Sequence, residues 1–225
     1  MASKCNQLLS MKRNSIEVKF FDLSLLLHSP IMKQEDYSID IPEVFYSDSE
    51  GKPFEHCQVC GKFLLEPGSS YVIEKAFKNY KGYDFNTTIF EYAICLDCHM
   101  QLQKSMSQES VSRLQQYYME IMSRKGSLPF PVESENFELD RWISNCFFKE
   151  EPVNEMDEFQ LVAQFNGNKM ITSVPPMVVG EHAMEEMADL LSDKTIDELN
   201  NFRDRYFGPD PELEELFTRK KLLLI

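Results

Sequence analysis

The sequence has 225 residues, of which 43% are hydrophobic and 27% are charged, and its formal net charge is −14 at pH 7. This composition is typical of one or two folded units and excludes an intrinsically disordered chain. No apolar run approaches the length of about 18 residues that a membrane-spanning helix requires. Residues 1–10 also lack the apolar core of a signal peptide. We therefore expect a cytoplasmic protein without a membrane anchor.

The first 52 residues predict an N-terminal segment and a linker. Residues 16–27 are the most apolar part of this segment. Residues 16–20 alternate between apolar and polar side chains, as in a half-buried strand, whereas residues 21–27 also fit a buried helix. The sequence does not decide between the two. Residues 33–53 are polar, contain two prolines and one glycine, and predict a linker.

Two Cys-x-x-Cys pairs, Cys57/Cys60 and Cys95/Cys98, are the strongest chemical signal in the chain. A two-residue spacer lets both sulfurs of a pair reach one ion, and Zn²⁺ binds four thiolates in a tetrahedron. Gly61 supplies the permissive backbone that a tight turn needs after its second cysteine. We therefore predict one structural zinc ion per chain, bound by all four cysteines. Because four protein ligands leave no open position for water, we assign no catalytic residue and no other cofactor.

The residues between the two pairs predict a hairpin followed by a helix. Residues 70–77 and 87–94 are rich in β-branched and aromatic side chains, which indicates two strands, and residues 79–86 would join them. A helix is expected from Cys98 onward. A knuckle, a hairpin and a helix that carries the last ligands in its first turn resemble the treble-clef zinc fold over residues 55–106.

This resemblance implies an architecture and no particular activity, because treble clefs occur in nucleases, ribosomal proteins and protein-binding domains. The sequence Cys95-Leu96-Asp97-Cys98-His99 is also similar to the zinc-bearing HNH endonucleases. Those enzymes need a catalytic histidine, commonly on the hairpin, and residues 61–94 contain no histidine. The catalytic part of the resemblance therefore fails, and we expect the chain not to be an enzyme of this class.

Other interpretations of the cysteines stay open. The pairs could form disulfides in an oxidising compartment, or Cys95 and Cys98 could be a thioredoxin-like redox pair. His56 and His99 flank the site, and either could replace a cysteine as a ligand. We expect both histidines to lie beside the site or at the surface, because four thiolates already satisfy the ion.

After the second pair, residues 101–125 predict helices with one apolar face, and Ser107 is a candidate cap for a second helical piece. On that face we expect Tyr117 and Tyr118 to belong to the core and not to a base-stacking surface. Residues 128–131 contain two prolines and mark a boundary. The chain is thereby divided into an N-terminal segment (1–52), a zinc-binding module (53–126) and an acidic α+β region (127–225).

The last hundred residues predict helices and one hairpin, so the fold class is α+β. Residues 139–147 suggest an amphipathic helix with Cys146 as a small core residue. Residues 159–174 predict a hairpin because Asn166 and Gly167 favour a tight turn. Further helices are expected at 181–191, from a capping box at Thr195 onward, and at 212–224. The apolar residues 222–225 would pack on the body of the protein or on a partner.

The charge is distributed unevenly, which bears on possible partners. Residues 126–225 carry 21 acidic and 9 basic side chains, whereas residues 53–125 carry eight of each. Nucleic-acid binding depends on a basic field, so this distribution disfavours it. Lys75, Lys78 and Lys81 form either a small basic patch or, as we expect, part of a solvated loop.

These observations favour a zinc-stabilised, non-enzymatic protein-interaction or regulatory protein. Its expected partner is a protein, and a basic one suits the charge best. Nucleic-acid binding and a divergent treble-clef nuclease are the alternatives. The sequence predicts neither the specific partner nor the oligomeric state.

Overall fold

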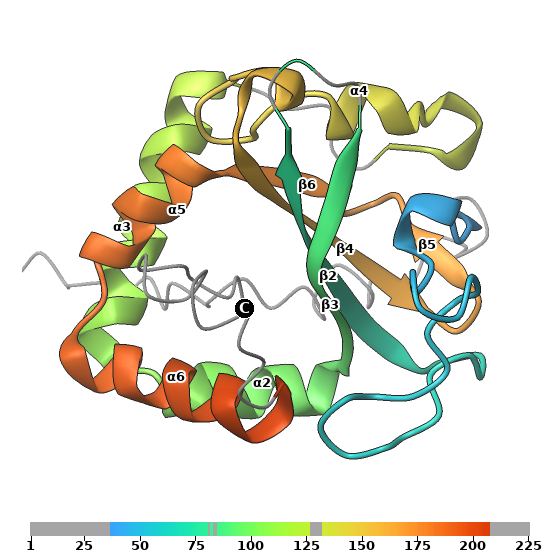
Figure 1. Ribbon diagram of the computed structural model, residues 1–225, viewed down its shortest axis with the longest axis horizontal. Helices are drawn as coiled ribbons and strands as arrows, with labels where there is room; N and C mark the ends of the chain where they lie inside the picture. The colour runs from blue at the N-terminus through green and yellow to red at the C-terminus, as the bar shows by residue number, and fades with distance from the viewer. Residues whose placement is uncertain (1–36, 81, 83–84, 127–131, 208–225) are drawn as a thin grey trace, which may run out of the picture.

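The computed structural model describes residues 37–80, 82, 85–126 and 132–207, and the statements below concern this part of the chain. It has the predicted α+β class, with six strands in one antiparallel sheet and five α-helices (Figure 1). The strands are β1 (Ser38–Asp40), β2 (Ser70–Asn79), β3 (Asn86–Cys95), β4 (Glu158–Asn166), β5 (Lys169–Ile171) and β6 (Met177–Gly180). The helices are α2 (Leu96–Ser105), α3 (Gln108–Lys125), α4 (Leu139–Ile143), α5 (Glu181–Asp189) and α6 (Asp193–Phe207).

The sheet joins segments that are far apart in the sequence. Its order is β1-β5-β4-β2-β3, and β6 also pairs with β4. β2 pairs with β3 on one side and with β4 on the other, where the register runs from Ser70 opposite Asn166 to Lys78 opposite Glu158. Residues 127–131, which contain the predicted boundary, lie outside the described part. Strands from both sides of that boundary therefore share one sheet.

Both predicted hairpins are present. β2 and β3 pair in the first hairpin, and β4 and β5 pair in the second. The second turn requires glycine for two reasons, because Gly167 has a φ of +57° and a Cβ atom there would lie 2.9 Å from the carbonyl oxygen of Glu66. The Tyr71 hydroxyl also donates a hydrogen bond to the carbonyl of Gly167 at 2.9 Å. The tight turn predicted from Asn166-Gly167 is thus fixed by its neighbours.

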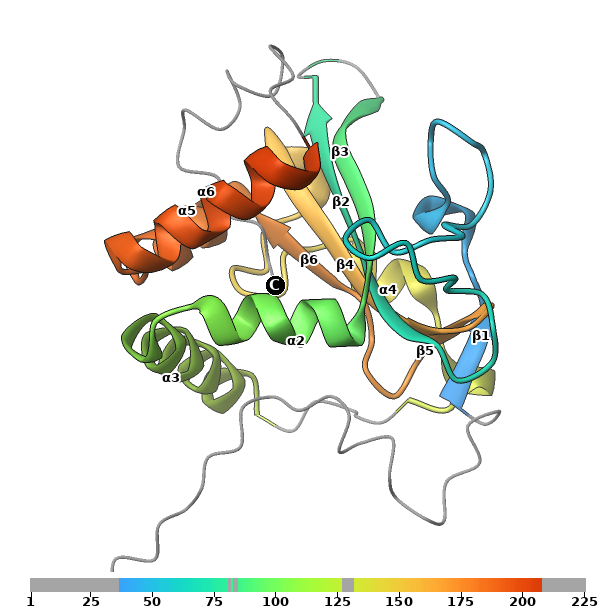
Figure 2. The ribbon, with the colours of Figure 1, turned by 90° about the horizontal axis from the view of Figure 1, so that it is seen from below.

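The two faces of the sheet are covered by different parts of the chain, as Figure 2 shows. Helices α2, α3, α5 and α6 lie on one side, and the segment before β2 lies on the other. On this second side, the Phe45 and Phe165 rings make an edge contact with centroids 5.2 Å apart. Ile41 and Phe45 are both buried in the core. The stretch predicted as a linker therefore contains β1 and contributes core residues.

Two predictions for residues 101–125 are confirmed, namely the cap at Ser107 and the packing of Tyr117 and Tyr118. α2 and α3 are separate helices, and the Ser107 side chain caps α3 by accepting a hydrogen bond from the backbone N–H of Ser110. Tyr117 stacks on Phe148 and Tyr118 stacks on Phe147. Both tyrosines therefore pack against the hydrophobic core, as predicted.

The helix predicted at residues 139–147 is shorter than expected, because α4 ends at Ile143. The backbone N–H of Cys146 donates to the carbonyl of Glu151 at 2.8 Å, and Cys146 forms a bridge with Val178 of β6. These contacts place Cys146 in the core, as predicted, but outside the helix. Because Cys146 pairs with Val178 of β6, the helix does not continue beyond Ile143.

The last described helix begins earlier than predicted. α6 starts at Asp193. Its cap is Ser192 and not Thr195, because the Ser192 hydroxyl accepts a hydrogen bond from the backbone N–H of Thr195. The hydroxyl groups of Ser107, Ser110, Ser192 and Thr195 are linked by hydrogen bonds, so the first turns of α3 and α6 cap each other.

The predictions for residues 16–27, 212–224 and 222–225 lie outside the described part of the chain. Among the helices that the structure does describe, none combines the length and the apolar character needed to cross a membrane.

Candidate metal centre

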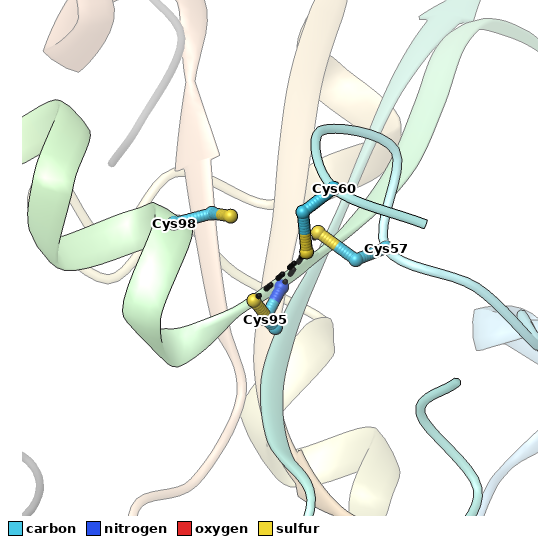
Figure 3. A group of neighbouring side chains, drawn as sticks. All are labelled: Cys57, Cys60, Cys95 and Cys98. Atoms are coloured by element: carbon cyan, nitrogen blue, oxygen red, sulfur yellow. Dashed lines mark hydrogen bonds between the residues drawn. The ribbon is translucent and has the colours of Figure 1, made fainter. Parts of the chain in front are cut away.

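Cys57 and Cys60 lie in a tight turn before β2. The N–H of Cys57 donates to the carbonyl of Lys62, and the N–H of Gly61 donates to the carbonyl of Cys57, both at 2.9 Å. Gly61 has a φ of +71°, which a side chain would disfavour, so the glycine predicted after the pair is required by the turn. This turn places both side chains of the pair toward the end of β3 (Figure 3).

Cys95 and Cys98 lie where β3 passes into α2. Cys95 is the last residue of the strand and the N-cap of the helix, and Cys98 is in the first helical turn. Backbone hydrogen bonds hold the first pair against this corner. The N–H of Gln58 donates to the carbonyl of Ala93 at 2.9 Å, and the N–H of Cys95 donates to the Sγ atom of Cys57 at 3.3 Å.

The four sulfur atoms form one compact group, here called the cysteine cluster (Cys57, Cys60, Cys95 and Cys98). All four Sγ atoms lie within 4.8 Å of one another, and those of Cys60 and Cys95 are 3.7 Å apart. Sulfurs at about 2.3 Å from a tetrahedral zinc ion lie roughly 3.8 Å from one another. The cluster therefore has the size and the donor chemistry that suit a soft metal ion such as zinc.

Burial is unequal within the cysteine cluster, and the thiol pKa values shift in opposite directions because a hydrogen bond outweighs burial at Cys60, whereas burial dominates at Cys95 and Cys98. A hydrogen bond from the backbone N–H of Lys62 lowers the pKa of Cys60, which is exposed. Burial raises the pKa values of Cys95 and Cys98. Several adjacent thiolates repel one another in a buried site, so the cluster favours deprotonation only when a cation neutralises the sulfurs.

The two histidines near the cysteine cluster do not belong to it. Within the described part of the chain, the group of potential ligand atoms within 4.8 Å consists of the four cysteines alone. His56 is exposed and packs edge-on against Phe63, with ring centroids 5.5 Å apart. His99 is buried, and burial lowers its pKa to about 4. The structure thus brings the four predicted ligands together and leaves both histidines beside them.

Sequence reasoning missed a second polar group, which surrounds a buried lysine and is here called the lysine cluster (Lys75, Asp48 and Glu91). Lys75 is 1% exposed, and its Nζ atom lies 2.6 Å from Oδ1 of Asp48, 3.0 Å from Oε2 of Glu91 and 2.6 Å from the carbonyl of Tyr46. Lys75 is therefore neither in a solvated loop nor in a basic patch. Lys78 also lies in β2, and Lys81 lies outside the described residues.

The lysine cluster contains its own counter-ions, with one lysine placed between two carboxylates. Burial alone would raise the pKa of Asp48, but hydrogen bonds from Lys75 and Thr88 lower it below its ordinary value. Glu91 also accepts hydrogen bonds from the Ser47 hydroxyl and from the backbone N–H of Asp48. A sequence signal did exist, because Lys75 lies two residues from both Ile73 and Phe77 and therefore shares the buried face of β2 with these apolar residues.

The comparisons with known proteins give no relative for this chain. No family model matches the sequence, no curated protein is similar to it, and no solved structure is similar to its fold.

Proposed function

We propose that the chain is a zinc-stabilised, non-enzymatic protein-interaction or regulatory module. In it, Cys57, Cys60, Cys95 and Cys98 bind one structural zinc ion. The observation that carries this proposal is the cysteine cluster, in which four sulfurs from three segments gather within 4.8 Å. Zinc would neutralise the thiolates and fix the turn at Cys57 to the corner between β3 and α2. A site with four protein ligands has no open position for a substrate or a water, which supports a structural role.

We also propose that this part of the chain has a treble-clef-like arrangement. Support comes from the order of its parts, with the turn at Cys57 and Cys60, the β2–β3 hairpin and then α2 with Cys98 in its first turn. The hairpin here is part of a larger sheet, because β2 also pairs with β4. The zinc site would therefore stabilise the edge of a six-stranded sheet.

The proposed partner is a basic protein that binds the acidic surface of α5 and α6. Exposed acidic side chains on these helices include Glu185, Asp193 and Asp197. Glu186 differs from them because it is already bonded to Lys149 and to the Tyr117 hydroxyl. Complementary charge would mainly increase the rate and specificity of association, and salt would weaken it.

We rank nucleic-acid binding and nuclease activity below this function. Of the three lysines that could have formed a basic patch near the hairpin, Lys75 is buried and paired with Asp48 and Glu91. Residues 61–94 contain no histidine for nuclease chemistry.

Two measurements test the proposal in sequence. Protein purified under reducing conditions with zinc supplied should contain one equivalent of zinc by elemental analysis, and a content near zero would contradict the site. The zinc-loaded chain should then retain basic proteins from a native lysate at low salt and lose them at high salt. Retention of nucleic acid in a parallel assay would favour the alternative.

A matched pair of variants tests the surface. Asp193→Lys combined with Asp197→Lys should reduce partner retention, because it reverses charge on α6. Glu133→Lys combined with Glu135→Lys changes the net charge equally, at a site away from α5 and α6, and should leave retention nearly unchanged. Equal losses in both variants would contradict a specific surface on these helices.

A further inference from the structure

The four cysteines of the cysteine cluster differ in their access to solvent. Cys57 and Cys95 are each 2% exposed and Cys98 is 8% exposed, whereas Cys60 is an exposed residue. Figure 3 shows Cys60 on the turn, with its side chain pointing toward that of Cys95. A reagent that diffuses from solvent therefore reaches Cys60 more easily than the three buried cysteines.

The Cys60 sulfur has a close neighbour in Cys95. Cys60 Sγ lies 3.7 Å from Cys95 Sγ, and a disulfide requires about 2.05 Å, so the two atoms would have to approach by roughly 1.7 Å. Cys95 is held at the end of β3, so Cys60 is the partner that would move.

We infer that Cys60 is the redox-sensitive ligand of the site, and that a peroxide releases the metal by joining Cys60 to Cys95 in a disulfide. This inference rests on the proposed zinc site. It adds a regulatory property, because oxidation would remove two of the four ligands and free the turn from its metal.

The chemistry balances with hydrogen peroxide as the oxidant. The Cys60 thiolate attacks one peroxide oxygen, so that an S–O bond forms, the O–O bond breaks and hydroxide leaves, which gives a sulfenic acid. The Cys95 thiolate then attacks the Cys60 sulfur, so that the S–S bond forms, the S–O bond breaks and a second hydroxide leaves. The two sulfurs supply two electrons, and two protons from solvent convert the hydroxides to water. The thiolates of Cys57 and Cys98 alone cannot satisfy a tetrahedral ion.

The test uses the full chain loaded with zinc and treated with substoichiometric hydrogen peroxide. A chromophoric chelator should report one zinc released per disulfide formed, and mass spectrometry should identify Cys60–Cys95 as the first disulfide. A first disulfide between Cys57 and Cys60, or between Cys95 and Cys98, would overturn the inference. So would stoichiometric zinc release without any disulfide.

Two histidine variants separate the exposed ligand from a buried one. Cys60→His keeps four ligands but removes the exposed thiolate, and it should slow zinc release by peroxide about tenfold or more. Cys98→His replaces a buried ligand and should release zinc nearly as fast as the natural protein. Equal rates in the two variants would overturn the inference.

The outcomes also distinguish this inference from the function on which it rests. A protein that binds no zinc before oxidation would overturn both. A protein that binds one zinc, but whose first disulfide lacks Cys60, would overturn the redox inference alone. If Cys60→His does not bind zinc, the disulfide map of the natural sequence decides.

Discussion

Two polar clusters attach the segment before β2 to the outer strand β3, and they differ in what balances their negative charge. The lysine cluster joins Asp48 to Lys75 and Glu91 through ion pairs of 2.6 and 3.0 Å. The cysteine cluster joins the turn at Cys57 to Cys95 through sulfur atoms. The first contains its own cation, Lys75, whereas the second consists of four thiol groups within the described part of the chain.

This difference indicates when each attachment forms. The lysine cluster can form once β2, β3 and the segment that contains Asp48 come together, because its cation and its carboxylates all belong to the chain. The cysteine cluster reaches full strength only when a metal neutralises its thiolates, so its contribution to folding depends on metal supply. The middle of β3, at Glu91, is thus held by the sequence alone, whereas its last residue, Cys95, would depend on zinc.

The largest effect is expected from Cys95→Ser. It removes a ligand at the corner between β3 and α2, so the zinc content should fall from one equivalent to near zero. Structural zinc contributes about 10–16 kcal/mol of apparent binding energy in small zinc domains. We therefore expect fast amide exchange in the turn at Cys57 and in α2. Elemental analysis and hydrogen exchange measure the two effects.

The control for this variant is Cys146→Ser, which changes a buried thiol away from the cluster. It should keep its zinc even if it lowers stability. The zinc dependence would be contradicted if Cys95→Ser retained a full equivalent of metal and showed the natural exchange pattern.

A second prediction concerns the cluster that needs no metal. Lys75→Met keeps much of the side-chain volume but removes the charge between Asp48 and Glu91. It should lower the free energy of unfolding by about 3 kcal/mol, toward the lower end of the range for broken buried ion pairs because Asp48 reaches solvent. Denaturant unfolding of the zinc-loaded protein measures this loss.

The zinc content of the same variant tests whether the lysine cluster and the cysteine cluster act independently. Lys75→Met should still bind one equivalent, because the lysine cluster does not supply a metal ligand. Lys78→Met is the matched control on the same strand, and its side chain points to the other face. A loss for Lys78→Met as large as for Lys75→Met would argue against the ion pairs as the cause.

A third, smaller effect should follow from breaking the uncharged junction between α3 and α6. The Ser110 hydroxyl accepts the N–H of Ser192 at 2.8 Å and is fully buried. Ser110→Ala leaves that N–H without a partner, so we expect a loss of about 1–2 kcal/mol in denaturant unfolding. Ser123→Ala, at an exposed position of α3, should change stability by less than about 0.5 kcal/mol. Identical losses would contradict the role of the junction.

The smallest effect is a pH dependence at His182. Its hydrogen bond and charge interaction with Glu151 raise the pKa of His182 above the ordinary value. This stabilisation is complete below the unfolded-state pKa of about 6.5 and is lost as the pH rises through the higher folded-state pKa. Because the pair is exposed, we expect at most about 0.3 kcal/mol. His182→Gln should therefore lower the melting temperature slightly at pH 5.5 and not at pH 9.

The sequence alone determined both hairpins, most of the helices and the candidate metal ligands. Spacing within each Cys-x-x-Cys pair is a short-range property, so the proximity of Cys57 to Cys60, and of Cys95 to Cys98, followed directly from it. The Asn166-Gly167 turn and the Ser107 cap are equally local, because each depends on the backbone of a few consecutive residues. These predictions required no knowledge of the neighbouring strands.

The tertiary structure decided what covers each residue. Lys75 and Glu74 are adjacent in β2 and point to opposite faces, yet both are buried because the sheet is covered on both sides. Gln164 in β4 is also buried, opposite Val72 in the register between β2 and β4. The sequence pattern shows which residues share a face of a strand, but it does not show which distant segment packs against that face. The pairing of β2 with β4 across the predicted boundary, and the burial that follows from it, therefore depend on contacts between distant segments.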